Sequence, residues 1–247
     1  MLELVKSGIK GLDQLLKGGF RRNISVLITG SPGAGKTIMA LQFVYYGMKN
    51  YKENGIFIST EESLEDIRYY GKSFGMDIEK YEKNGSIILV EKSVSTLKGG
   101  IVSIEALLNL IKKNKIRRVS LDSIVFFQYL YSQKEHGIEF RRQVLMFIQQ
   151  LKKAGVTFLV VSEKTRIDLD RVEYDLLDFV FDAVIIATRV RKGAYFERLI
   201  SIIKVRGQEH SLDLYPMTIS SEGVTILTDQ TPFSLVEKEE SKKENHT

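Results

Sequence analysis

One eight-residue segment of this 247-residue chain has the residue types and spacing of a phosphate-binding loop. It runs Gly30-Ser31-Pro32-Gly33-Ala34-Gly35-Lys36-Thr37 and satisfies the P-loop (Walker A) pattern G-x-x-x-x-G-K-S/T. The glycines let the backbone curl, so that several N–H groups point at the phosphates of a nucleotide. Lys36 adds a positive charge there, and the Thr37 hydroxyl is placed to ligate Mg²⁺. We therefore expect the whole segment to bind ATP and Mg²⁺.

Three acidic residues stand where strands are expected to end, close to such a loop. Asp122 ends the strand expected at 118–121, and an Asp at the carboxyl edge of a buried strand can hold Mg²⁺ in the manner of a Walker B residue. Glu61 and Glu62 follow the run 56–59, where a carboxylate can accept a proton from the attacking water. The alternative is that all three cap a turn or a helix, and for the two glutamates the residues alone favour it slightly.

The elements that must position these residues alternate between strand and helix. Continuous apolar runs predict strands buried on both faces at 24–29, 56–59, 87–90, 118–121, 157–161 and 183–187. Helical spacing of apolar residues predicts helices at 36–51, 64–74, 101–114 and 140–154. Antiparallel strands are expected at 198–205, 213–219 and 224–227. The predicted fold class is α/β, with a mostly parallel central sheet flanked by helices and C-terminal antiparallel strands.

Length and composition fit one such unit. No linker divides residues 1–230, so we expect a single domain, followed at 234–247 by a polar tail that should be disordered. The chain has no cysteine, which excludes disulfides and thiolate chemistry, and its three histidines are too far apart to suggest a zinc site. No long apolar run and no signal-peptide pattern is present, which predicts a cytoplasmic protein without membrane contact. A net charge of +5 does not by itself indicate a nucleic-acid binder.

Several further segments, taken in order, make the chain resemble the KaiC-like ATPases of the RecA superfamily. The resemblance runs from about Ser7 to Leu227. Its segments are Ser7-Gly8-Ile9-Lys10-Gly11-Leu12-Asp13 with Gly18-Gly19-Phe20, the P-loop, Ser59-Thr60-Glu61-Glu62-Ser63, Leu121-Asp122-Ser123, Val161-Ser162-Glu163, and Lys204-Val205-Arg206-Gly207 followed by His210. Any one of them is common, but their presence in this order is specific.

The resemblance implies a RecA-like P-loop NTPase fold and Mg²⁺-dependent hydrolysis of ATP. It raises Glu61 and Glu62 above the capping interpretation, with Glu61 the stronger candidate for activating water. It also implies that Lys204 and Arg206 reach the γ-phosphate bound by a neighbouring subunit, and that His210 lies near the sugar or base. A site completed by a neighbour implies a homo-oligomer, and a hexameric ring is the family expectation. Without the resemblance, Lys204 and Arg206 would be two residues on one face of an exposed strand.

The function predicted from this resemblance is an ATPase ring whose hydrolysis gates an unknown protein partner. The family's clock proteins carry two such domains in tandem and this chain carries one, so a clock role is poorly supported. No adjacent Ser/Thr pair stands where the autokinase half of those proteins is phosphorylated. A small-molecule kinase is disfavoured as well, because no arginine-rich lid segment stands out.

A DNA-dependent recombination or repair ATPase is the main alternative, because the RecA superfamily includes strand-exchange proteins. Their DNA-binding loops would correspond to 131–139 and 164–178, and the second holds three basic residues against five acidic ones. Such a balance does not attract phosphates. A basic cluster at 112–118 is interpreted as a helix end, where cations offset the dipole, with a nucleic-acid patch as its alternative. Nucleic-acid binding therefore stays possible but is not favoured.

Overall fold

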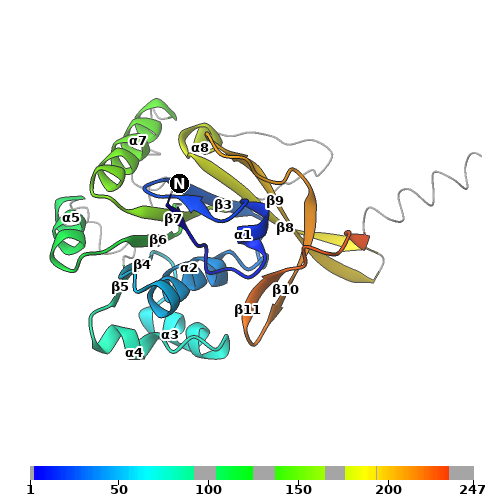
Figure 1. The fold of residues 1–247 in the computed structure, drawn as a ribbon, viewed down its shortest axis with the longest axis horizontal. Helices are drawn as coiled ribbons and strands as arrows, with labels where there is room; N and C mark the ends of the chain where they lie inside the picture. Colours follow the sequence, from blue (N-terminus) through cyan, green and yellow to red (C-terminus); the bar gives the residue numbers. More distant parts are fainter. Residues whose placement is uncertain (1–2, 92–103, 125–136, 165–175, 193, 234–247) are drawn as a thin grey trace, which may run out of the picture.

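The computed structural model describes residues 3–91, 104–124, 137–164, 176–192 and 194–233, and structural statements concern these residues. Its main strands are β3 (Ser25–Gly30), β4 (Gly55–Ser59), β5 (Ile87–Glu91), β6 (Arg118–Asp122), β7 (Thr157–Val161), β8 (Ala183–Lys192), β9 (Tyr195–Val205), β10 (Leu214–Ser220) and β11 (Gly223–Ile226). They form one sheet in the order β11-β10-β9-β8-β3-β7-β6-β4-β5 (Figure 1). The part from β8 to β5 is parallel, whereas β9, β10 and β11 each run antiparallel to their predecessor. The predicted α/β class is thereby confirmed.

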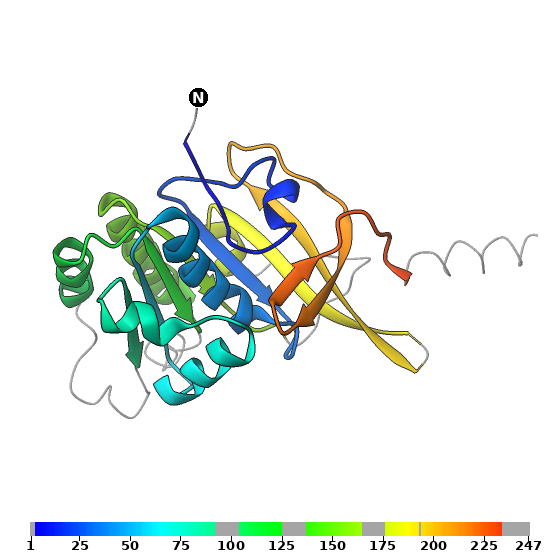
Figure 2. The ribbon, with the colours of Figure 1, turned by 60° about the horizontal axis from the view of Figure 1, so that its bottom comes forward.

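Helices cover both faces of the parallel part, as its apolar strands require (Figure 2). On one face lie α1 (Leu12–Leu15), α2 (Lys36–Tyr51), α3 (Leu64–Ser73) and α4 (Ile78–Lys83), and on the other α5 (Ile104–Lys113), α7 (Gly137–Lys153) and α8 (Leu176–Val180). Side chains of β3 alternate between the two layers: Val26 and Ile28 join the core under α2, while Leu27 joins the core under α5 and α7. No helix in the described part is both long and apolar enough to cross a bilayer.

The predicted strands and helices are present, with ends that differ by a few residues. The strand predicted at 183–187 extends to Lys192 because it pairs with β9 as a long hairpin up to Lys192↔Tyr195. Short elements went unpredicted, namely α1, α4, α8 and the separate ribbon of β1 (Leu4–Val5) with β2 (Phe20–Arg21), since so few residues show no periodicity. The tail 234–247, the start of the helix predicted at 101–114 and most of both candidate DNA loops lie outside the described residues.

Arg118 is not part of an exposed basic cluster, although the basic residues next to it in the sequence suggested one. Its side chain is fully buried, and its guanidinium donates to Glu53 Oε2 at 2.7 Å and to the carbonyl oxygens of Lys6 and Phe43 at 2.8 and 3.0 Å. It also lies over the Phe43 ring, 4.8 Å from the ring centroid. Arg118 therefore ties the N-terminal segment and α2 to the first residue of β6, and it is not available to an external anion.

Candidate functional site

Four neighbouring parallel strands deliver the candidate residues to one edge of the sheet. These strands are neighbours in the order β4-β6-β7-β3. Glu61 and Glu62 follow β4, Asp122 ends β6, Glu163 follows β7, and the P-loop begins at the last residue of β3. The register places Ser59 beside Asp122 and Asp122 beside Val161, so these strands end at the same level. The carboxyl edge of an open parallel sheet is where such folds bind ligands.

The P-loop backbone has a conformation that its glycines permit. A Cβ on Gly30 would collide with the carbonyl oxygen of Ala187 on β8, which runs alongside. Gly33 and Gly35 have φ angles of 72° and 93°, in the left-handed region that glycine adopts without strain, and Gly35 immediately precedes α2. The loop therefore leads directly into the start of a sixteen-residue helix, where backbone N–H groups and the helix dipole favour an anion.

Lys36 is buried at the centre of this loop, with 6% of its side chain exposed. Its ammonium donates to the carbonyl oxygens of Gly30 and Ser31 at 3.0 and 2.9 Å, and Glu163 Oε1 lies 3.8 Å away. Burial lowers the pKa of Lys36, and the negative charge of Glu163 opposes that shift. The ammonium thus sits at the cleft with carbonyl oxygens and one longer ion pair as partners, a setting that favours an incoming anion.

A cleft of about 370 Å³ joins the loop to the acidic residues. Of the predicted site residues it is lined by Gly33, Gly35, Lys36, Thr37, Glu61, Glu62 and Asp122. Gly30, Ser31, Pro32 and Ala34 belong to the loop but do not line the cleft. The lining also includes residues for which no role was predicted, among them Tyr70, Ser123 and Glu163. Glu163 could have been found by the strand-end argument used for Asp122, because it follows β7.

Glu61 and Glu62 are held by different partners. Glu61 Oε1 accepts a hydrogen bond from the Ser123 hydroxyl at 2.6 Å, which turns it toward the end of β6. Glu62 Oε2 accepts from the Tyr70 hydroxyl at 3.3 Å. The N-cap of α3 is Ser63, whose side chain accepts from the Asp66 backbone N–H. The capping position is therefore filled by another residue, and both glutamates face the cleft.

Asp122 lines the cleft and is hydrogen-bonded to the Thr37 side chain. Burial raises its pKa to about 6, and Glu61 adds to the rise, while the Thr37 hydrogen bond and Lys36 oppose it. A hydroxyl and a carboxylate side by side form an oxygen donor set, which suits Mg²⁺. In the described chain no group of three or more metal-binding side chains occurs, as is usual where Mg²⁺ takes its other ligands from water and phosphate.

The raised pKa of Asp122 gives a prediction about stability. A carboxyl whose folded pKa lies above its ordinary value of 3.8 stabilises the fold below that value and loses this contribution as the pH rises through about 6. Asp122→Asn is therefore expected to raise the free energy of unfolding of the nucleotide-free protein by about 1–3 kcal/mol at neutral pH, and to change it little below the ordinary pKa. Urea unfolding of both proteins, at neutral pH and at a pH below the ordinary pKa of Asp, measures this difference in the free energy of unfolding. The exposed Asp229→Asn is the control, and a gain that does not depend on pH would contradict the explanation.

Lys204, Arg206 and His210 do not line the cleft of their own chain. Lys204 pairs with Val184 near the start of β8, so it lies at the amino edge of the parallel strands, opposite the P-loop. The Arg206 guanidinium donates to the Phe179 carbonyl oxygen at 2.6 Å. His210 Nδ1 lies 2.9 Å from the Ser211 carbonyl oxygen, beside the end of α1. The structure thus separates these residues from the other predicted site residues within one protomer.

Comparison with known proteins gives a consistent result. The model of the KaiC ATPase family matches residues 5–231. The circadian clock oscillator protein KaiC of Parathermosynechococcus lividus is 32% identical over 229 residues, which cover 90% of this chain and 42% of that protein. KaiC of a Nostoc strain is 32% identical over 234 residues, covering 91% and 44%. This chain therefore spans less than half the length of these curated relatives.

A solved structure of similar length is also related. The crystal structure of a KaiC-like protein from the hyperthermophilic archaeon Pyrococcus horikoshii superposes with a TM-score of 0.78 at 32% sequence identity. The match covers 92% of this chain and 99% of the archaeal one.

Proposed function

This chain belongs to the KaiC family of ATPases, and from that premise we propose that it binds ATP with Mg²⁺ and hydrolyses it in the cleft at the carboxyl edge of the sheet. One observation supports this most directly: the cleft brings Lys36, Thr37, Glu61 and Asp122 together from three separate segments of the chain. These are the kinds of side chain that phosphoryl transfer to water requires. We further propose that the matched region forms a single ATPase domain.

Each part of the cleft has a role in this proposal. The N–H groups of the loop and the start of α2 bind the phosphates, and Lys36 adds its charge. Thr37 and Asp122 hold Mg²⁺, which would neutralise part of the negative charge of the phosphates. Glu61, held by the Ser123 hydroxyl, accepts the proton of the attacking water. Glu62, held by the Tyr70 hydroxyl, is a second carboxylate in the same cleft and assists Glu61.

The site is completed by a second copy of the chain. Lys204 and Arg206 lie at the edge of the sheet opposite the cleft, so they could serve a γ-phosphate only in a neighbouring protomer. A head-to-tail contact that repeats and closes generates a ring, and we propose a hexamer whose hydrolysis gates a protein partner.

Arg206→Ala is expected to slow hydrolysis in the assembled form while leaving ATP binding in place, because a cation at the transferring phosphoryl group acts mainly in the transition state. Mixing this variant with Glu61→Gln protein should restore part of the activity, since some interfaces would then combine an intact glutamate with an intact arginine. The measurement is the hydrolysis rate as a function of the mixing ratio, after subunit exchange has been shown with two differently labelled samples. Rates that merely average those of the two pure variants would contradict a shared site.

The proposed function as a whole is tested by ATP hydrolysis over a range of protein concentrations, with mass measured by light scattering. A rate per subunit that rises with assembly and ignores single-stranded DNA supports a ring that gates a protein partner. Strong stimulation by single-stranded DNA would favour a recombination or repair ATPase instead.

A further inference from the structure

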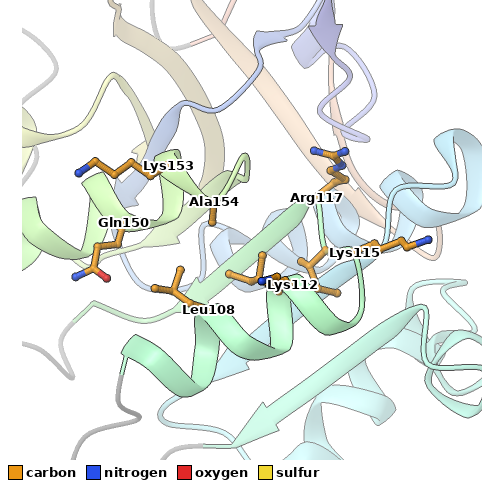
Figure 3. A pocket seen from close by; sticks show the side chains of 9 residues that line it. Leu108, Lys112, Lys115, Arg117, Gln150, Lys153 and Ala154 are labelled. Carbon is orange, nitrogen blue, oxygen red and sulfur yellow. The ribbon is translucent and has the colours of Figure 1, made fainter.

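A second hollow lies at the amino edge of the sheet, away from the nucleotide cleft. It is a groove of about 560 Å³ between the last turn of α5, the last turn of α7 and the segment that leads into β6 (Figure 3). Both helices run back over the sheet, so their ends precede the first residues of β6 and β7. The groove is therefore separated from the P-loop by the length of the parallel strands.

The floor of the groove is apolar. It is formed by Leu108 and Ile111 of α5, by Ile116 in the turn that follows, and by Ala154 just after α7. Ile111 and Ile116 are buried in the core beneath, whereas Leu108 and Ala154 are partly exposed. Leu108 and Ala154 therefore offer apolar surface to another molecule, with the polar side chain of Gln150 beside them.

The rim of the groove is cationic and consists of Lys112, Lys115, Arg117 and Lys153, all exposed. Figure 3 shows the ammonium groups of Lys115 and Lys153 extending away from the floor in opposite directions, so that their stems line the groove and their charges surround it. The guanidinium of Arg117 reaches the end of α7, where Nη1 lies 3.4 Å from the position of a Cβ on Gly155. No acidic residue of the described chain lines the groove.

The intramolecular contacts leave these four charges largely uncompensated. Within the described residues none of the four is in an ion pair. Arg117 has an electrostatic effect on Glu3, but Glu3 is itself paired with Arg22 at 2.6 Å. A helix-dipole role accounts for Lys112 and Lys153, which lie in last turns. It does not account for Arg117, which lies outside both helices, next to β6.

A nucleic acid would use only part of this surface. Phosphates would pair with the rim, but among the described residues that line the groove there is no aromatic side chain on which a base could stack. The apolar floor would then remain uncovered. A polypeptide that combines apolar and acidic residues matches both the floor and the rim.

We propose that the groove between α5 and α7 binds a short acidic amphipathic segment of a partner protein. Apolar side chains of that segment contact Leu108 and Ala154 above the buried Ile111 and Ile116, and flanking Asp or Glu side chains face the lysines and Arg117. The inference supplies the class of partner that the proposed function leaves open. Binding at the groove does not require hydrolysis, so the two proposals can fail separately.

The test uses the full chain and a fluorescein-labelled helical peptide with leucines on one face and glutamates flanking them, measured by fluorescence anisotropy with and without ATP. The groove variant is Lys112→Glu/Arg117→Glu/Lys153→Glu. The control variant is Lys72→Glu/Lys80→Glu/Lys83→Glu, which makes the same change in charge at exposed lysines in the last turns of α3 and α4. We expect the groove variant to bind about tenfold or more weaker and the control variant to bind within about twofold of the wild type. Circular dichroism establishes that both variants are folded.

Two further probes separate the proposal from its rivals. A peptide of equal charge with serine in place of leucine should bind about tenfold weaker than the leucine peptide, because the floor then contributes nothing. Equal affinity for the two peptides, equal losses in the two variants, or no saturable binding to the wild type would each overturn the proposal. So would single- or double-stranded DNA that binds more tightly than the peptide and loses that binding in the groove variant.

Discussion

Lys36→Ala is expected to abolish ATP binding that calorimetry can measure, a loss beyond about a hundredfold in affinity. The ammonium of Lys36 lies inside the loop, 6% exposed, where water screens its charge far less than at the surface. Its removal would leave the phosphates with backbone N–H groups alone and with Asp122, Glu61 and Glu163 close by. The site would then change from one that attracts an anion to one that repels it.

The matched control for this prediction lies on the same helix. Lys49 is exposed in the last turn of α2, outside the cleft, so Lys49→Ala should leave ATP affinity nearly unchanged. Lys36→Met keeps most of the buried stem, and thermal unfolding of both Lys36 variants separates lost binding from lost folding. A folded Lys36 variant that binds ATP as tightly as the wild type would show that the phosphate site has been assigned wrongly.

Glu61→Gln is expected to keep ATP binding and to slow turnover by roughly 10²–10⁴. A glutamine side chain retains the shape of the glutamate and can still accept the Ser123 hydrogen bond, but it cannot take a proton from water. The change therefore removes the proposed chemical role and little else. Single-turnover hydrolysis measures the chemical step without a contribution from product release.

Glu62→Gln provides the comparison within the same cleft. Glu62 is held through the Tyr70 hydroxyl at 3.3 Å and not through Ser123. We expect a smaller effect on the chemical step from this variant. If Glu62→Gln proves the slower of the two, the roles of the glutamates are exchanged, and if neither variant is slow, both carboxylates hold the loops in place without acting on water.

The predicted site residues that line the cleft lie in, or directly after, segments that have a recognisable local pattern. A βα turn with the spacing of Gly30 to Thr37 has few conformations, and a carboxylate that follows a buried parallel strand must emerge at the carboxyl edge of the sheet. These two rules predict that Lys36, Thr37 and Asp122 meet at one edge of the sheet. For Glu61 the residues alone slightly favour a capping role, and the family resemblance was needed to predict that it faces the nucleotide. The α/β class follows equally from local periodicity, because helical and strand patterns alternate along the chain.

Other features depend on pairings between distant segments, which no local pattern contains. Arg118 is part of a run of exposed cations in the sequence, yet Glu53 and the carbonyl oxygens of Lys6 and Phe43 draw it into the core. The groove likewise exists only because the ends of α5 and α7, separated in the chain by β6, line the same hollow (Figure 3).

The sequence by itself thus determined the fold class, the phosphate loop and the strand-end position of Asp122, because those depend on periodicity and on the direction of parallel strands. The tertiary structure alone decided where the C-terminal cations lie. The antiparallel pairing of β9 with β8 carries Lys204 to the amino edge of the sheet, and Arg206 follows just beyond that strand. The order and direction of strands arise from contacts between residues far apart in the chain, and these are fixed only when the whole core packs.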